Sequence, residues 1–284
     1  MNQEQSKNDI IDKLKKIQTA EYILAKCYAG AFWIFQIILL CSAVVFAIYP
    51  LDILVCTITV FVAAVVGALL SCKSDKHKSN AENAKRKYEF SDAFGILPSK
   101  LDLASLECDV SENTLSRVSN ELLEGVAYYT MEQEGDRRAL EALRESAWFS
   151  LKLANKCKNL LLVALLLTLG LAYIFVTYFV EYGESVATAR MASKIVSVIL
   201  LFIISKGLLS NLLGYCNFAK ICENILSSTE KMLGQEKTER IYVIMLMSEY
   251  QLYRAQAPMI PTLLWEKKRK KLNGIWVNLY SAKK

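Results

Sequence analysis

Apolar residues in this chain gather in four blocks instead of recurring with the period of a surface helix or a strand. Each block is about 20 residues long, so as a helix it spans about 30 Å, the thickness of a hydrocarbon core. The first three blocks carry no charged side chain, and the fourth carries one lysine. In chain order they are Gly30–Tyr49, Ile53–Ser71, Asn159–Val180 and Ile195–Leu213.

Short connections join the first block to the second and the third to the fourth, and no long strand-like alternation occurs. The pattern therefore predicts an all-α integral membrane protein with four transmembrane helices arranged as two hairpins. Hydrophobic residues make up 54% of the chain and the mean hydropathy is +0.26, which is more apolar than a typical soluble domain. The expected parts are 1–29, an amphipathic cytoplasmic helix; 30–71, the first hairpin; 72–158, a helical cytoplasmic segment; 159–213, the second hairpin; and 214–284, a helical cytoplasmic tail.

Turn-forming residues divide the polar parts into shorter helices. A charged helix should extend from Cys72 to Phe94 and break at Gly95–Pro98, because proline disfavours helical backbone in the residue before it. Further helices are expected over Ser111–Gln133, over Arg137–Lys158 leading into the third block, and over Asn217–Ala257 with a break at Gly234.

The distribution of basic residues predicts the orientation in the membrane. Lys and Arg number five in residues 1–29, fourteen in 72–158 and twelve from residue 215 onward. The two short connections hold only Arg190 and Lys194. Because cytoplasmic segments carry the excess of Lys and Arg, both termini and the central segment should lie in the cytoplasm.

The sequence contains no pattern of a catalytic or metal site. His77 is the only histidine, and there is no nucleophile elbow, phosphate-binding glycine loop or zinc motif. Acidic residues alternate with basic ones in the polar parts, as on a solvated helix surface. We therefore expect a protein that is not an enzyme, with no cofactor and no metal, and with no DNA or RNA partner.

Lys206 is the one charged residue inside an apolar block. An ammonium in mid-bilayer costs about 3 kcal/mol on insertion scales. Lys206 lies about seven residues from the cytoplasmic end, about 10 Å, so its side chain could extend to the interface. Alternatively Lys206, with Ser205, Ser210 and Asn211, lines an aqueous pore; Gln36 in the first block raises the same two alternatives.

A stripe of small residues marks one face of the second block. Thr59, Ala63, Gly67 and Ser71 recur every four residues, a spacing that lets another helix approach closely. Packing within the first hairpin is the favoured interpretation, and packing between subunits is the alternative.

The tail carries a run of basic residues, Lys267–Lys271, flanked by Trp265 and Trp276. Such a run can bind anionic lipid headgroups, with the tryptophans as interfacial anchors. It can also contact a nucleotide, or it can be a solvated tail.

Four short segments, in their order along the chain, resemble the SMODS-associating four-transmembrane effector family. They are Ile17–Lys26, Tyr88–Pro98, Glu145–Ser150 and Ala257–Pro261. Two of them depart from the family at their ends, because Ser99 and Thr262 follow where the family more often has Trp and Asp.

Members of that family are described as candidate pore-forming effectors of bacterial anti-phage systems, encoded beside nucleotidyltransferases that make cyclic nucleotide or oligonucleotide signals. The resemblance implies a homo-oligomeric pore that such a signal, or a partner, opens to depolarise the inner membrane and abort infection. If this chain binds the signal, the cations available for its phosphates are Lys85, Arg86, Lys87, Arg137 and Arg138.

Two other functions fit the same sequence. One is a non-conducting membrane scaffold that recruits a soluble partner through its helical segments. The other is a constitutive small channel or transporter, although transporters usually have broken helices at mid-membrane and no apolar block here contains proline.

Overall fold

The computed structural model describes residues 3–48, 53–116, 118, 128–182, 186–204 and 207–281, and all regular secondary structure in these ranges is helical. Three helices exceed 40 residues: α1 (Gln3–Ile48), α2 (Ile53–Phe94) and α6 (Asp136–Tyr182). Each is about 60–70 Å long at 1.5 Å per residue. They run without interruption through the expected boundaries at 29/30, 71/72 and 158/159, so the membrane and polar parts share continuous helices.

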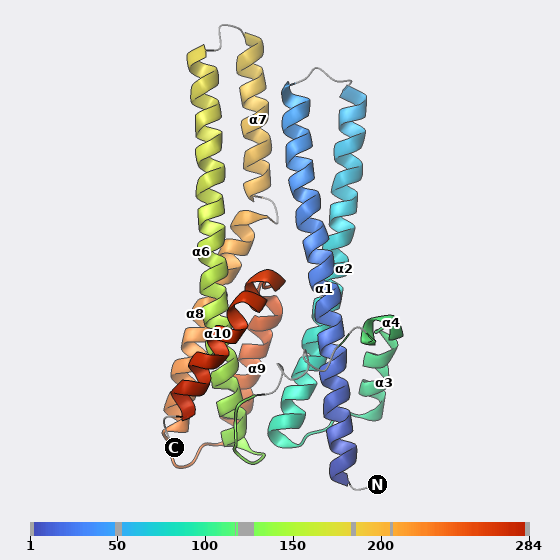
Figure 1. Cartoon of the computed structure of the whole chain (residues 1–284), viewed down its shortest axis with the longest axis vertical. Helices are drawn as coiled ribbons and strands as arrows, with labels where there is room; N and C mark the ends of the chain where they lie inside the picture. The colour runs from blue at the N-terminus through green and yellow to red at the C-terminus, as the bar shows by residue number, and fades with distance from the viewer. Residues whose placement is uncertain are drawn as a thin grey trace.

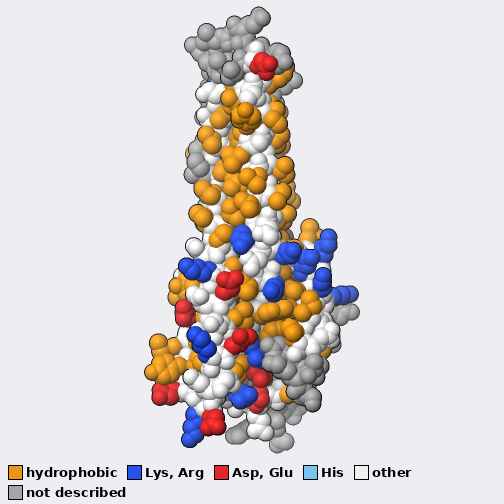
Figure 2. All heavy atoms as spheres, turned by 90° about the vertical axis from the view of Figure 1, so that its left-hand side faces the viewer, with side chains coloured by type: hydrophobic (Ala, Val, Ile, Leu, Met, Phe, Trp, Pro, Cys, Tyr) orange, Lys and Arg blue, Asp and Glu red, His pale blue; other side chains and the backbone are white. Residues whose placement is uncertain are grey.

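One half of the molecule presents apolar side chains to its surroundings. Phe61, Leu167 and Tyr173 are 68%, 64% and 70% exposed, and on the face drawn in Figure 2 hydrophobic side chains predominate in this half while most charged ones lie in the other. Such a surface is unfavourable in water and suits a lipid bilayer. Three helices, α1, α2 and α6, are long and apolar enough to cross a membrane, which indicates a membrane protein.

The fourth apolar block is not one helix. Helices α7 (Val186–Ile204) and α8 (Leu208–Leu233) divide the block, and Gly207, just before α8, has a non-helical backbone at φ −84° and ψ −112°. The absence of proline therefore did not exclude a break at this place. Ile195, Ile199, Ile203 and Leu208 pack with Ala172 in a buried cluster that spans the break.

The long helices lie in two pairs, α1 beside α2 and α6 beside α7 (Figure 1). In the polar half, His77 on α2 bonds through Nδ1 to Glu21 Oε2 on α1 at 2.9 Å, and its ring stacks on Tyr28. Leu14, Ile17 and Ala20 of α1 are likewise buried against α2. The expected amphipathic N-terminal helix therefore packs on the protein's own polar half.

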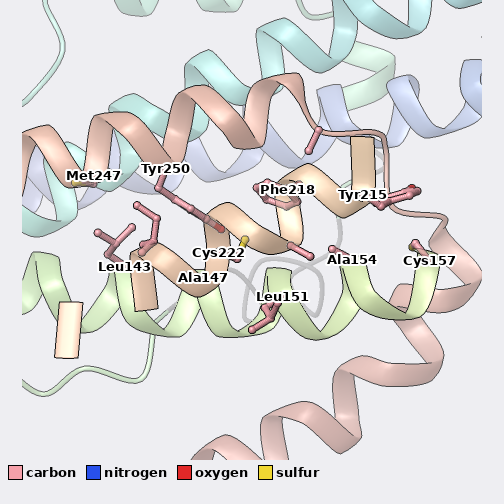
Figure 3. Close-up of a cluster of buried hydrophobic side chains, with 13 residues drawn as sticks. Leu143, Ala147, Leu151, Ala154, Cys157, Tyr215, Phe218, Cys222, Met247 and Tyr250 are labelled. Carbon is pink, nitrogen blue, oxygen red and sulfur yellow. The ribbon is translucent and has the colours of Figure 1, made fainter. Parts of the chain in front are cut away.

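The largest buried cluster lies in the polar half among α6, α8 and α9 (Arg240–Gln256), with residues from all three helices facing one another in Figure 3. Phe218 and Cys222 on α8 and Tyr250 on α9 are each no more than 5% exposed. The last helix, α10 (Thr262–Ser281), crosses the outside of this bundle (Figure 1).

The predicted break after Phe94 is confirmed, with Gly95 at φ +68°, and so is the end of a helix at Gly234. Among the described residues of the helix expected over Ser111–Gln133, only the single turn α4 (Glu112–Leu115) is helical, and residues 128–133 are not. A helix that was not predicted, α3 (Lys100–Cys108), begins with a capping box between Ser99 and Asp102.

Residues 128–133 are not helical because α6 holds them. Tyr129 N donates to Glu145 Oε2 at 2.9 Å, and Thr130 Oγ1 donates to Glu141 Oε2 at 2.6 Å. These long-range bonds replace the local bonds that a helix would make.

Candidate functional site

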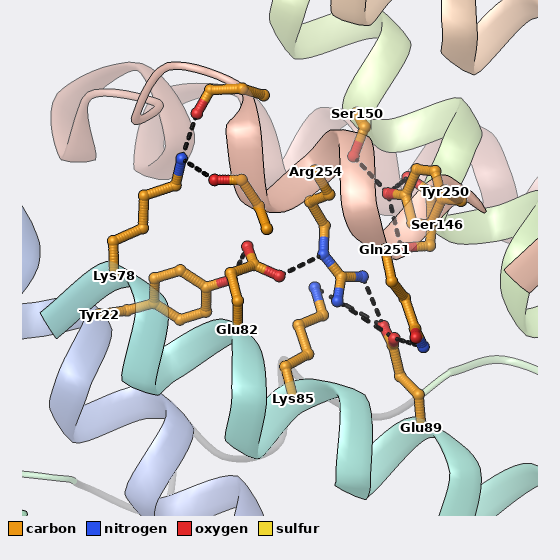
Figure 4. Close-up of polar contacts among 12 residues, drawn as sticks. Tyr22, Lys78, Glu82, Lys85, Glu89, Ser146, Ser150, Tyr250, Gln251 and Arg254 are labelled. Atoms are coloured by element: carbon orange, nitrogen blue, oxygen red, sulfur yellow. Dashed lines mark hydrogen bonds and ion pairs between the residues drawn. The ribbon is translucent and has the colours of Figure 1, made fainter. Parts of the chain in front are cut away.

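Helix α2 carries four ionisable side chains on one face of its polar half. Lys78, Glu82, Lys85 and Glu89 follow one another at spacings of four, three and four residues, which places them on one side of a helix. Helix α9 lies against this face (Figure 4).

Arg254 on α9 forms ion pairs with both carboxylates of that face (Figure 4). Its Nε donates to Glu82 Oε2 at 2.8 Å, while Nη1 and Nη2 donate to the two oxygens of Glu89 at 2.6 and 3.1 Å. The three side chains are only 5–8% exposed. A buried carboxylate–guanidinium fork of this kind combines strong bonds with a fixed geometry.

Neutral groups occupy further positions around the two carboxylates. Glu89 accepts from Gln251 Nε2 and from Tyr128 OH, both at 2.7 Å, and Glu82 accepts from Tyr22 OH on α1. Lys85 Nζ lies 4.0 Å from Glu89 Oε1. The cluster thus holds two cations, Lys85 and Arg254, and two anions, Glu82 and Glu89. Such a balance is expected because a buried charge is costly unless it is paired.

The environment keeps the central three groups ionised at neutral pH. Burial is the largest single effect and would raise the pKa values of Glu82 and Glu89, but the charges of Arg254 and Lys85 together with the hydrogen bonds outweigh it and lower both. Burial likewise acts to lower the pKa of Arg254, and the two carboxylates raise it. Burial, aided by the nearby Arg254 charge, lowers the pKa of Lys85 to about 8.

Helix α9 also bonds to α6, so it links the two pairs of long helices. Tyr250 OH lies 3.0 Å from Ser146 Oγ and 2.8 Å from Ser150 Oγ, both on α6. On the α2 side, Lys78 Nζ donates to the carbonyls of Ala255 and Ala257 at the end of α9 (Figure 4). We call Tyr250, Gln251 and Arg254 of α9, the carbonyls at its end, and the side chains that bond to them or to Glu82 and Glu89 the α9 clamp.

A second junction joins α2 to α6 directly. Arg138 donates to both carboxylate oxygens of Asp92 at 2.9 and 3.2 Å, and Gly135 N donates to the carbonyl of Ala93 at 2.8 Å. The polar ends of the two helix pairs are therefore held together at two levels.

This arrangement holds helices together. Each carboxylate of the cluster has a cation beside it, Arg254 for Glu82 and both Arg254 and Lys85 for Glu89. Within the described ranges, no group of three or more His, Cys, Asp or Glu side chains is placed to hold a metal ion.

The five cations predicted for a phosphate ligand contact different partners. Lys85 belongs to the buried cluster and Arg138 to the Asp92 junction. Arg86 lies 3.4 Å from Asn83 Oδ1, Lys87 lies 2.7 Å from Asp102, and Arg137 lies 3.4 Å from Glu132. Each of these side chains thus has a polar partner within the chain, and their role towards a phosphate ligand stays a prediction.

The predicted pore-lining residues are scattered. Lys206 and Ser205 lie outside the described residues, between the ends of α7 and α8. Asn211 Nδ2 donates to the carbonyl of Gly207 at 2.7 Å in the first turn of α8, while Ser210 is exposed. Gln36 lies against α2, where a methyl group on Gly67 would come 3.2 Å from its Nε2.

The small-residue stripe contacts the protein's own α1 in part. Gly67 faces Gln36 and Phe32, and Ala63 is 8% exposed. Thr59 bonds back to the carbonyl of Val55 at 2.8 Å and is exposed, and Ser71 is half-buried. The close approach of Gly67 to Gln36 and Phe32 of α1 favours packing within the first hairpin.

The α9 clamp was missed by sequence reasoning. Charged residues of the polar parts were interpreted as a solvated surface, and this is wrong for Glu82, Glu89 and Arg254. The available signal was the four-three-four spacing on α2, but the sequence does not show that a helix 165 residues away covers that face.

Comparisons with family models, with curated proteins and with solved structures returned no match to this chain.

Proposed function

We propose that this chain is a multi-pass protein of the bacterial inner membrane, with four crossing segments in two hairpins and both termini in the cytoplasm. The exposed apolar surface of α1, α2 and α6 supports this, as does the apolar cluster in which α7 packs against α6. Lys and Arg are concentrated in the polar half, which is the half expected to stay in the cytoplasm.

Its proposed activity is to permeabilise that membrane when a signal molecule or a partner activates it, as an effector of an anti-phage signalling system. The observation that carries this proposal is the α9 clamp. In it, the buried Arg254 of α9 forms ion pairs with α2, and Tyr250 of the same helix forms hydrogen bonds with α6. Because α2 and α6 continue unbroken into the apolar half, a movement of the clamp is transmitted to the membrane segments.

The segments that resemble the effector family also support the proposal, because all four contribute to the clamp. They supply Tyr22, Glu89, the pair Ser146 and Ser150, and the carbonyl of Ala257. Segments far apart in sequence thus share one mechanical role.

Four helices packed together leave no aqueous lumen, so conduction requires several copies or a separation of the hairpins. A cyclic nucleotide, an oligonucleotide or a partner protein opens the pore by binding the open state more tightly than the closed one. A neighbouring nucleotidyltransferase is the proposed source of the signal.

Ion and dye leakage from liposomes containing the purified protein tests this function. We expect leakage to begin when one member of a panel of cyclic nucleotides and oligonucleotides is added. Leakage under no condition, including addition of a cell extract from infected bacteria, would refute a pore formed by this chain.

Two variants sharpen the test. Arg254→Ala should leak without any activator, because the clamp loses its central cation, whereas Arg240→Ala on the same helix should behave like the wild type. Lys206→Leu should reduce leakage if Lys206 lines the pore, and unchanged leakage would remove that residue from the conduction path.

One observation favours the alternative function of a membrane scaffold. Ile241, Tyr242 and Met245 on α9 are 56–60% exposed in the polar half, and such an apolar face is typical of a protein-binding surface. Single-channel recordings separate the alternatives, because a scaffold carries no current.

The non-helical backbone at Gly207, just before α8, is the observation that favours a constitutive channel or transporter. Helix ends inside the membrane expose backbone groups that can bind ions. A constitutive channel would conduct in the absence of every activator, whereas the proposed effector would not.

A further inference from the structure

Helix α10 is fixed to the bundle by its apolar side. Trp276 is 4% exposed, and its ring centroid lies 5.2 Å from that of Trp148 and 6.2 Å from that of Phe149, both on α6. Leu264 packs against the main buried cluster. Trp276 is therefore a packing residue and not the interfacial anchor that the sequence suggested.

The other side of α10 carries the basic run. Lys267, Lys270 and Lys271 are exposed, and none of them forms an ion pair with a side chain in the described part of the chain. Glu266 is the only acidic residue of the helix. This side of α10 is thus a positively charged surface without an internal counter-charge.

The beginning of α10 lies where the apolar half starts. Lys26 Nζ stands 6.0 Å from the ring centroid of Trp265, and Lys26 is four residues before the first apolar segment. Figure 2 shows Lys and Arg side chains gathered at the edge of the molecule directly below the apolar band. Leu263, at the same end of α10, is 82% exposed.

We infer that α10 is a binding surface for anionic phospholipids of the leaflet that faces the polar half. The lysine ammonium groups contact headgroup phosphates, and Leu263 enters the acyl boundary. Each basic residue near an anionic leaflet strengthens association about fivefold. The inference rests on the membrane placement proposed above but not on ion conduction.

The geometry favours lipid over a free nucleotide. A nucleotide site is concave and encloses most of its ligand, whereas these lysines stand on the outward side of a helix. The lipid contact is also connected to the α9 clamp, because α10 follows α9 through the short linker Pro258–Pro261. Tyr215 OH holds that linker by donating to the carbonyl of Met259 at 2.7 Å.

Binding of individual lipids to the full chain in neutral detergent, resolved by native mass spectrometry, tests the inference. The probes are phosphatidylglycerol and phosphatidylcholine with identical acyl chains. Lys267, Lys270 and Lys271 are changed together to Gln, and a matched control changes Lys100, Lys231 and Lys237, which are exposed at the ends of α3, α8 and the following connection.

We expect the wild type and the control to prefer phosphatidylglycerol at least tenfold, and the α10 variant to lose most of that preference. Equal preference in the α10 variant and the wild type would overturn the inference, as would an equal loss in the control. Competition by a cyclic dinucleotide for the same sites would also overturn it. A chain that binds neither lipid would instead contradict the membrane placement, and leakage is not involved in any of these outcomes.

Discussion

Arg254 and Glu89 are 165 residues apart in the sequence, yet they form a two-pronged ion pair that is almost completely buried (Figure 4). Glu89 lies on a helix that continues into the first apolar hairpin, and Arg254 lies on a helix that also bonds to α6. Removing one partner leaves a buried charge without compensation, which costs far more than losing an exposed pair.

Arg254→Ala should lower the free energy of unfolding by about 3–5 kcal/mol because Glu82 and Glu89 are left buried and unpaired. Arg240→Ala should cost less than about 1 kcal/mol, since Arg240 is 64% exposed beside Asp136. Chemical denaturation in detergent measures both. Similar losses in the two variants would show that the ion pairs of Arg254 are not central to the fold.

Glu145 predicts a pH dependence of stability. Its burial raises the pKa to about 7, despite the bond from Tyr129 N, so the folded state holds a proton that the unfolded state releases near pH 4.5. Stability should therefore fall as the pH rises from about 4.5 to about 7, by at most about 3 kcal/mol.

Glu145→Gln should remove that fall, because the amide stays neutral and its carbonyl oxygen can still accept from Tyr129 N. Thermal unfolding at several pH values should show the variant more stable than the wild type above pH 7 and equal to it near pH 4. A parallel pH profile in both proteins would contradict the assignment.

Gly67→Leu should separate α1 from α2, because even a methyl group at this position would come 3.2 Å from Gln36 Nε2. Overpacking of this kind costs about 1–3 kcal/mol. Gly170→Leu in the apolar part of α6 is the control, since nothing lies within 4 Å of the added carbon. If Gly67→Leu leaves the melting temperature unchanged but alters the oligomeric state, the stripe packs between copies instead.

Gly214→Ala and Gly274→Ala should shift stability in opposite directions. A methyl group at Gly214 would lie 2.6 and 2.9 Å from two ring carbons of Pro258, a rigid neighbour, so the linker must move and stability should fall. At Gly274 nothing lies within 4 Å, so alanine should add about 0.5–1 kcal/mol through helix propensity. Melting temperatures in detergent test both signs, and a stabilised Gly214→Ala would exclude the close approach.

The sequence by itself determined the helical class, the apolar segments of α1, α2 and α6, and the helix ends at Phe94 and Gly234. These features follow from local properties: long uncharged runs, and glycine or proline where a helix must end. The sequence did not reveal the non-helical backbone at Gly207, because an apolar run without proline looks continuous.

Only the tertiary structure decided which charged residues are buried. The spacing of Lys78, Glu82, Lys85 and Glu89 is equally consistent with a solvated surface and with a covered one, because one helix does not record what packs on it. Whether Arg254 meets that face depends on long-range packing of α9 between α2 and α6. Trp276 shows the same limit, since its burial against Trp148 depends on where α10 lies and not on the residues beside it in sequence.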